Sequence, residues 1–256
     1  MLQAHSFLWH YLWLAPHVLQ LVLAIVLWRR GLHKLFPLFL AYCIFEALEE
    51  FTLYGLDVLP SVSGETFWRA FCVGLVIEGL IKFTVIGELA LHLLRPWPAV
   101  AKVGNELIRG AGVVLVLLAI LAAAYAPIDN PQNAIISRAH ILEQALYIVL
   151  SGLVLSLFLF ATYFKLSWNN FAFGIALGFG ILSCQHLAAW AVTASGAAPD
   201  KRHLLDLLNM ATYHVCVLIW FYYLMVPPKI RAKSAVPLPE HNLEIWNREL
   251  ERLLQQ

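Results

Sequence analysis

The sequence predicts an all-α, polytopic integral membrane protein: a seven transmembrane helix bundle followed by a C-terminal amphipathic helix. Hydrophobic residues make up 61% of the 256 residues and charged residues only 13%, and the mean hydropathy is +0.74. A soluble domain has about a quarter of its residues charged, because its surface faces water. A net charge of +1 excludes a strongly basic surface, so nothing indicates a nucleic-acid partner.

Seven apolar runs, joined by short polar connectors, are each long enough to cross a bilayer, which takes about 20 helical residues. They form one expected domain, residues 1–228. The first run lacks the basic start and the cleavage site of a signal peptide, so we expect it to be a retained helix. The runs lie at about 9–28, 35–56, 67–93, 107–126, 139–164, 171–194 and 203–226.

Basic residues alternate between connectors and so predict the orientation. By the positive-inside rule, the N-terminus is outside the cell membrane and the C-terminus is in the cytoplasm. The richer side carries Arg29, Arg30, Lys34, Arg95, Lys102, Arg109, Lys165, Lys229, Arg231 and Lys233. The other side carries Arg69, Arg138, Lys201 and Arg202.

Residues 229–256 are expected to form a cytoplasmic basic linker and an amphipathic helix. This helix could lie on the inner membrane surface, dock on a partner protein, or pack under its own bundle. The fourth run has no polar stripe, so we place it at the periphery or at a contact with another chain. The apolar face of the C-terminal helix carries Leu243, Trp246, Leu250, Leu253 and Leu254.

Two consecutive runs carry a matched stretch with a buried carboxylate. FEALEEFTLYGL, from Phe45, and IEGLIKFTVIGE, from Ile77, share Glu, Leu, Phe, Thr and Gly in one register. Glu46 and Glu78 each lie eleven residues into their runs, about 16 Å deep at 1.5 Å per residue. Because the two helices run in opposite directions, we expect the two carboxylates at one level, as in an inverted repeat.

Polar residues at helical spacing occur on six of the seven runs. A charge facing lipid at the bilayer centre costs about 3 kcal/mol or more, so we expect these side chains to face inward. Many of them lie in the outer half, which predicts a cluster reached from the extracytoplasmic side. Glu78 and Lys82, one turn apart, are expected to form a structural ion pair. The candidate ligand-binding residues are Glu46, Glu49, Glu50, Glu78, Tyr147, Asp206 and Tyr213.

Carboxylate and imidazole groups suit first-row transition metals such as zinc, iron or manganese. The His140 and Glu143 spacing matches the ligand pairs of carboxylate-bridged bundle sites, although in reversed order. A haem between His186 and His214 is a weaker alternative. The four cysteines form no CxxC, so no cysteine zinc site is indicated. The candidate metal ligands are His17, Glu46, Glu78, His140, Glu143, His186 and His214.

The sequence lacks the key residues of three membrane protein families that it was compared with. The topology resembles that of seven-helix rhodopsins, but the seventh run has no lysine for retinal. Ceramidase-type hydrolases carry an HxxxH in their last span. The last run of this chain instead has His203 and His214, which are eleven residues apart. Prenyl proteases of the CAAX type carry EExxxR, whereas Glu49 and Glu50 precede FTLYG. No family is identified.

Three functions therefore remain open. The first is a binding or sensing protein that takes up a cation, a proton or a small polar ligand from outside. The second is a membrane-embedded metalloenzyme or haem protein. The third is an accessory subunit of a larger membrane complex, bound through the fourth run or the C-terminal helix.

Overall fold

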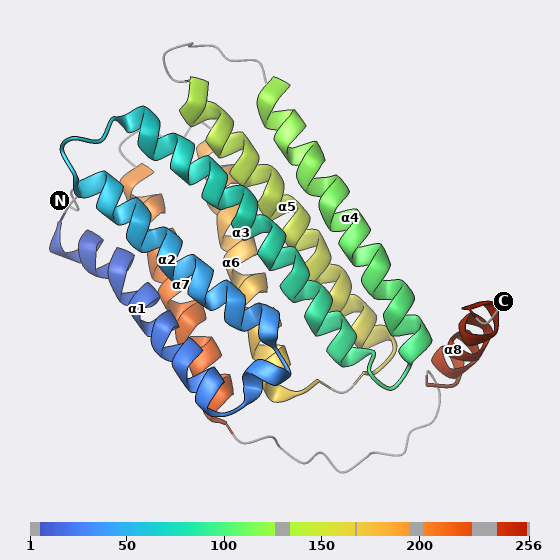
Figure 1. Ribbon diagram of the computed structural model, residues 1–256. Coiled ribbons are helices and arrows are strands. Elements are labelled where there is room, and N and C mark those ends of the chain that lie inside the picture. Colours follow the sequence, from blue (N-terminus) through green and yellow to red (C-terminus); the bar gives the residue numbers. More distant parts are fainter. Residues whose placement is uncertain (1–5, 126–133, 167, 195–201, 227–239, 255–256) are drawn as a thin grey trace.

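The protein is all-helical in the computed structural model, which describes residues 6–125, 134–166, 168–194, 202–226 and 240–254 (Figure 1). These residues contain eight α-helices, one short 3-10 helix and no strand. The α-helices are α1 (Phe7–Arg29), α2 (Pro37–Val58), α3 (Gly64–Leu93), α4 (Pro98–Tyr125), α5 (Ala134–Tyr163), α6 (Asn170–Ala194), α7 (Arg202–Met225) and α8 (Glu240–Leu254). The 3-10 helix, η1, covers Leu32–Lys34.

Five of the described helices are long and apolar enough to cross a membrane, namely α1, α3, α5, α6 and α7. This confirms the expected helical membrane character. Helix α2 falls outside that set because Glu46, Glu49 and Glu50 interrupt its apolar sequence. In α4, Gly110–Tyr125 counts as a shorter apolar helix. Crossings by α2 and α4, and the orientation of the termini, stay predictions.

The helix bounds follow the expected runs closely, with one clear difference at α4. This helix begins at Pro98, although residues 98–106 were expected to be a connector. Proline is favoured in a first helical turn, where its missing N–H group costs nothing. The Asn247 Oδ1 atom of α8 accepts hydrogen bonds from the backbone N–H groups of Ala99 (2.9 Å) and Val100 (3.4 Å). The N–H groups of the first turn, which lack partners within the helix, are thereby satisfied.

Helix α3 is central to the bundle, since it packs against α2, α4, α5 and α6. Helix α1 packs against α2 and α7, and α6 packs against α5 and α7 (Figure 1). Helix α4 contacts α3, α5 and α8, and exposes Val113, Leu117 and Leu121 on its outer side. It therefore lies at the edge of the bundle, where its lack of a polar stripe is compatible with lipid.

The GxxxG of α6 lets α7 approach closely. A Cβ atom on Gly174 would lie 2.5 Å from the Cβ atom of Tyr223, and one on Gly178 would lie 2.2 Å from the Trp220 Nε1 atom. The Sγ–H group of Cys216 also donates to the carbonyl of Gly178, at 3.3 Å. Small residues at this spacing thus join α6 to α7 in the way the motif predicts.

A buried carboxylate near the C-terminal end of α3 holds the start of α2. The two oxygens of Glu88 accept from the backbone N–H groups of Leu38 (2.9 Å) and Phe39 (3.0 Å). These N–H groups belong to the first turn of α2, which begins at Pro37. A carboxylate is favoured there by the free N–H groups and by the helix dipole. We therefore assign Glu88 a structural role.

The C-terminal helix is present as α8, and it contacts α4. This contact is the third of the arrangements considered from the sequence. Of the expected apolar face, Trp246 and Leu253 are exposed and Leu250 is half-buried. The side chains of Leu243 and Leu254, and the basic linker at 229–239, lie outside the described residues. Membrane or partner contacts of this helix stay predictions.

Candidate functional site

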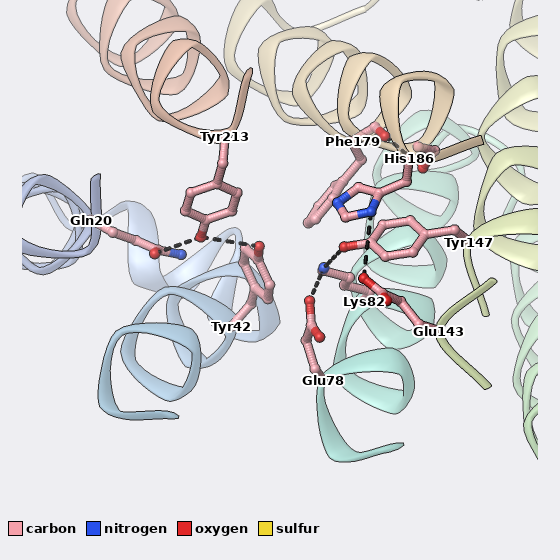
Figure 2. Close-up of polar contacts among 10 residues, drawn as sticks. Gln20, Tyr42, Glu78, Lys82, Glu143, Tyr147, Phe179, His186 and Tyr213 are labelled. Carbon is pink, nitrogen blue, oxygen red and sulfur yellow. Dashed lines mark hydrogen bonds and ion pairs between the residues drawn. The ribbon is translucent and has the colours of Figure 1, made fainter. Parts of the chain in front are cut away.

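Lys82, deep inside the bundle on α3, is the centre of the candidate site. Its Nζ atom donates to Glu78 Oε1, one helical turn earlier, and to the Tyr147 hydroxyl of α5 at 3.3 Å. It also lies 5.7 Å from the ring centroid of Tyr42 and 5.1 Å from that of Tyr147. Aromatic faces stabilise a desolvated cation. The expected pair of Glu78 with Lys82 is therefore part of a larger contact set (Figure 2).

Carboxyl groups from three helices lie within electrostatic range of this ammonium group. Each interacts electrostatically with Lys82, and Glu78 does so as its direct ion-pair partner. Three lie on α2, one on α3 and one on α5. Antiparallel packing of α2 against α3 also brings Glu46 within electrostatic range of Glu78, as their matched positions predict. The five carboxyl groups belong to Glu46, Glu49, Glu50, Glu78 and Glu143.

The three glutamates of α2 share one arc but have different surroundings. Glu46 is only 6% exposed, and its Oε2 atom has no hydrogen-bond partner among the described residues. The Oε1 atom of Glu49 packs against α3 at Gly74, where an added Cβ atom would lie 1.8 Å from it. Glu50 Oε2 accepts from the indole Nε1–H group of Trp13 at 2.7 Å. Buried polar atoms normally have partners, and Glu46 Oε2 is the only carboxyl oxygen among the buried, unpartnered side-chain atoms of the described residues.

Helices α5 and α6 contribute a second cluster of ionisable side chains, which consists of Glu143 and two histidines. Glu143 Oε2 lies 3.6 Å from His140 Nδ1, and Glu143 Oε1 lies 3.6 Å from His186 Nδ1. The His186 ring stacks on the ring of Tyr147, with centroids 3.8 Å apart and planes at 7°. Tyr147 thus links this group to Lys82 (Figure 2).

A chain of hydroxyl groups connects the site to α1 and α7. The Tyr213 hydroxyl donates to Gln20 Oε1 at 2.7 Å and lies 3.4 Å from the Tyr42 hydroxyl. His17 stacks on Tyr213, with centroids 5.0 Å apart. Because Tyr42 also faces Lys82, polar contacts extend from α1 through α7 and α2 to α3 (Figure 2).

The expected metal ligands do not all share one environment. His140, Glu143 and His186 form one group, and Glu46 and Glu78 lie on the Lys82 side. His17 contacts Tyr213, and His214 contacts Tyr11 with ring centroids 6.0 Å apart. Asp206 is exposed on α7. Within the described ranges, no three His, Cys, Asp or Glu side chains are arranged to hold a metal ion.

Two site residues were not singled out from the sequence. Tyr42 precedes Glu46 by four residues, and Gly74 precedes Glu78 by four, so each lies on the inner face of its helix. Helical spacing from the glutamates could have indicated both. An aromatic ring or a glycine in an apolar helix is too common to attract notice without the neighbouring helices.

A small cavity adjoins the ion pair between α3 and α5. It has a volume of about 10 Å³, and its polar lining comes from Glu78, Lys82 and Tyr147. Its apolar lining includes Phe83 and Leu146. A cavity volume of about 10–15 Å³ is needed to hold a water molecule. The cavity is therefore at the lower limit of what one water needs, beside three groups that can bond it.

Neither the family models, nor the curated proteins, nor the solved structures with which the chain was compared gave a match.

Proposed function

We propose that this protein is a multi-pass membrane protein that binds positive charge, as protons or a small cation, in its carboxylate-rich interior. The observation that supports this most is the charge balance around Lys82. One ammonium group interacts with the carboxyl groups of five glutamates. Binding of this kind matches the first of the three functions considered from the sequence.

More carboxyl groups than cations remain even when each available cation is paired with one carboxylate. If Lys82 neutralises Glu78, and a protonated histidine neutralises Glu143, three carboxyl groups of α2 are left: Glu46, Glu49 and Glu50. Removing an ionised carboxylate from water costs several kcal/mol even after relaxation. Such groups bind protons or a cation instead of remaining as uncompensated charges. The unpartnered Oε2 atom of Glu46 gives this ligand a position.

The proposed topology has seven crossings, from α1 to α7, with the N-terminus outside the cell membrane. Helix α2 has 22 residues, about 33 Å at 1.5 Å per residue, which suffices for a hydrocarbon layer of about 30 Å. In this orientation the His140 end of α5 is extracytoplasmic, so the cluster is reached from outside. The basic connectors support the assignment.

A change at the occupied site is proposed to reach helix α1 through two hydrogen-bonded contacts. Protonation of Glu50, or a cation beside it, would weaken its hydrogen bond from Trp13, because a carboxylate accepts more strongly than a carboxyl group. This change reaches α1. The Tyr42, Tyr213 and Gln20 chain also ends on α1, so two independent contacts couple the occupied site to that helix.

Tryptophan fluorescence of the full chain in lipid nanodiscs tests the proposal. One series varies pH at constant ionic strength, and a second varies sodium or calcium at constant pH. We expect a saturable change in one of the series, which distinguishes protons from cations. Trp13→Phe should remove most of the change, and Glu50→Gln should reduce it. A wild-type signal that stays constant in both series, with a folded protein, would refute binding of positive charge.

A further inference from the structure

The ionisable side chains between the surface and Lys82 form a graded series. The exposed fraction of the side chain is 62% for His140, 26% for Glu143, 18% for His186 and 4% for Lys82. Consecutive members come from α5, α5, α6 and α3. His140 and Tyr147 are seven residues apart on α5, about 10 Å along the axis. The series thus connects the rim of the bundle to its interior.

We propose that protons enter the interior through His140, Glu143 and His186. This inference rests on the proposed function, since it names the path by which positive charge reaches the carboxyl groups. A proton from bulk water binds His140 and passes to Glu143 Oε2. The protonated carboxyl group then rotates about its Cγ–Cδ bond, which brings the O–H group to His186 Nδ1, and the proton passes to that nitrogen and leaves Glu143 ionised. His186 passes a proton inward from its other ring nitrogen. Each transfer moves one proton, and each donor regains its starting state.

The geometry of Glu143 suits a group that both accepts and donates. Its two oxygens face different imidazoles, each 3.6 Å from a ring nitrogen. Hydrogen bonds to such nitrogens are normally about 2.7–3.2 Å long, so a shift of about half an ångström, or one bridging water, completes each step. An imidazole offers two ring nitrogens, one for uptake and one for release.

The inner end of the path joins the Lys82 group. Tyr147 stacks on His186, and its hydroxyl lies 3.3 Å from Lys82 Nζ. The cavity of about 10 Å³ beside Tyr147, Lys82 and Glu78 is close to the volume that a water molecule needs. A water there would bond the phenol and the carboxylate together. This supplies a step from the Tyr147 hydroxyl to Glu78. The step from His186 to that hydroxyl needs a bridging water of its own, because stacked rings exchange no proton through their faces.

The charged groups around the path come from several helices. Glu50 of α2 and Lys82 of α3 both interact electrostatically with Glu143. Near His140, α3 contributes the edge of Trp68, with ring centroids 5.6 Å apart, and the exposed pair of Arg69 with Glu65 lies on the adjoining turns. On α4, Lys102 and Glu106 are exposed in the first three turns of the helix, and on α7 Asp206 is exposed.

Stopped-flow measurement of proton uptake tests the path. The full chain in nanodiscs is mixed with a weakly buffered solution of lower pH that contains an indicator dye. We expect His140→Ala to slow uptake by the interior by roughly a hundredfold, the lower end of what a positioned proton-transfer group contributes. The final amount taken up by the interior stays the same. Imidazole in solution should restore the rate, because His140 is exposed. Glu143→Gln should also slow uptake, without rescue by imidazole.

His33→Ala is the matched control, because His33 stacks on Trp28 in the connector between α1 and α2, away from the path. Its uptake rate should equal that of the wild type. Equal rates in the His140, Glu143 and control variants, with normal uptake, would overturn the path and leave the proposed function intact. Absence of uptake by the wild-type interior, with no cation bound either, would overturn the proposed function itself.

Discussion

Replacing Lys82 with methionine tests the electrostatic core of the account. Methionine is unbranched and fills most of the space of the lysine stem, so the substitution removes the charge with little change in packing. Glu78 then loses its direct partner in a site where Lys82 is almost fully buried. Breaking a buried ion pair by removing one partner costs about 3–5 kcal/mol. Loss of the contacts with the rings of Tyr42 and Tyr147 adds about 0.5–2 kcal/mol.

A double-mutant cycle separates these effects. Lys82→Met, Glu78→Gln and the double variant are unfolded with sodium dodecyl sulfate in mixed micelles, and helix loss is followed by circular dichroism. We expect Lys82→Met to lose about 3.5–7 kcal/mol at neutral pH, and the double variant to recover most of the part that belongs to the ion pair. Glu78 without its cation stays buried only when protonated, so the deficit of Lys82→Met should shrink as pH falls toward 5.

Additive effects of the two substitutions would exclude an interaction between Lys82 and Glu78. If the two single changes sum to the double change within about 0.5 kcal/mol, the charges do not interact in the membrane-embedded protein. A deficit of Lys82→Met that is independent of pH would contradict the same step. Glu65→Gln, at an exposed pair with Arg69, is the control and should change stability by less than about 1 kcal/mol.

Three further changes have expected outcomes in the same unfolding assay or in proteolysis. Glu88→Ala leaves two backbone N–H groups of α2 without acceptors and should cost about 1–3 kcal/mol for each group that stays buried, whereas a cost below about 0.5 kcal/mol would exclude the capping role. Gly178→Ala forces the Trp220 ring to shift and should lower the stability by about 1–3 kcal/mol. The control, Gly152→Ala, has open space around it and should be neutral or stabilising. Equal effects of the two substitutions would contradict the close packing of α6 on α7. Asn247→Ala removes the acceptor at the start of α4 and should speed proteolytic removal of α8 without changing the stability of the bundle; unchanged proteolysis would mean that this contact does not hold α8.

The helices could be predicted from the sequence because the bilayer imposes a simple rule on it. An apolar run of about 20 residues must satisfy its own backbone, and only a helix does so. The start of α4 at Pro98 could not be predicted in this way, because its first turn depends on Asn247, some 150 residues later. Local polarity indicates a connector there, whereas the structure has a helix whose first turn is capped by Asn247.

The candidate site could be predicted only in part. Spacing on one helix predicts that Glu46, Glu49 and Glu50 share an arc, since positions i, i+3 and i+4 share a face. It does not show which helices are neighbours, so the contacts of His17 and His214 with tyrosines instead of the carboxyl groups could not be foreseen. The roles of Tyr42 and Gly74 likewise depend on the packing of α2 against α3.

Infrared spectroscopy of the full chain can determine whether the interior carboxyl groups carry protons, because the carbonyl stretch of a protonated carboxyl group is distinct from that of a carboxylate. We expect protonated carboxyl groups at neutral pH, or a bound cation detected by elemental analysis. Glu46→Gln, Glu49→Gln and Glu50→Gln should each reduce the carbonyl band of the protonated carboxyl groups, or the amount of bound cation, whereas Glu65→Gln should change neither. A spectrum in which every carboxyl group is ionised at neutral pH, in a protein without bound cation, would contradict the proposed binding of positive charge.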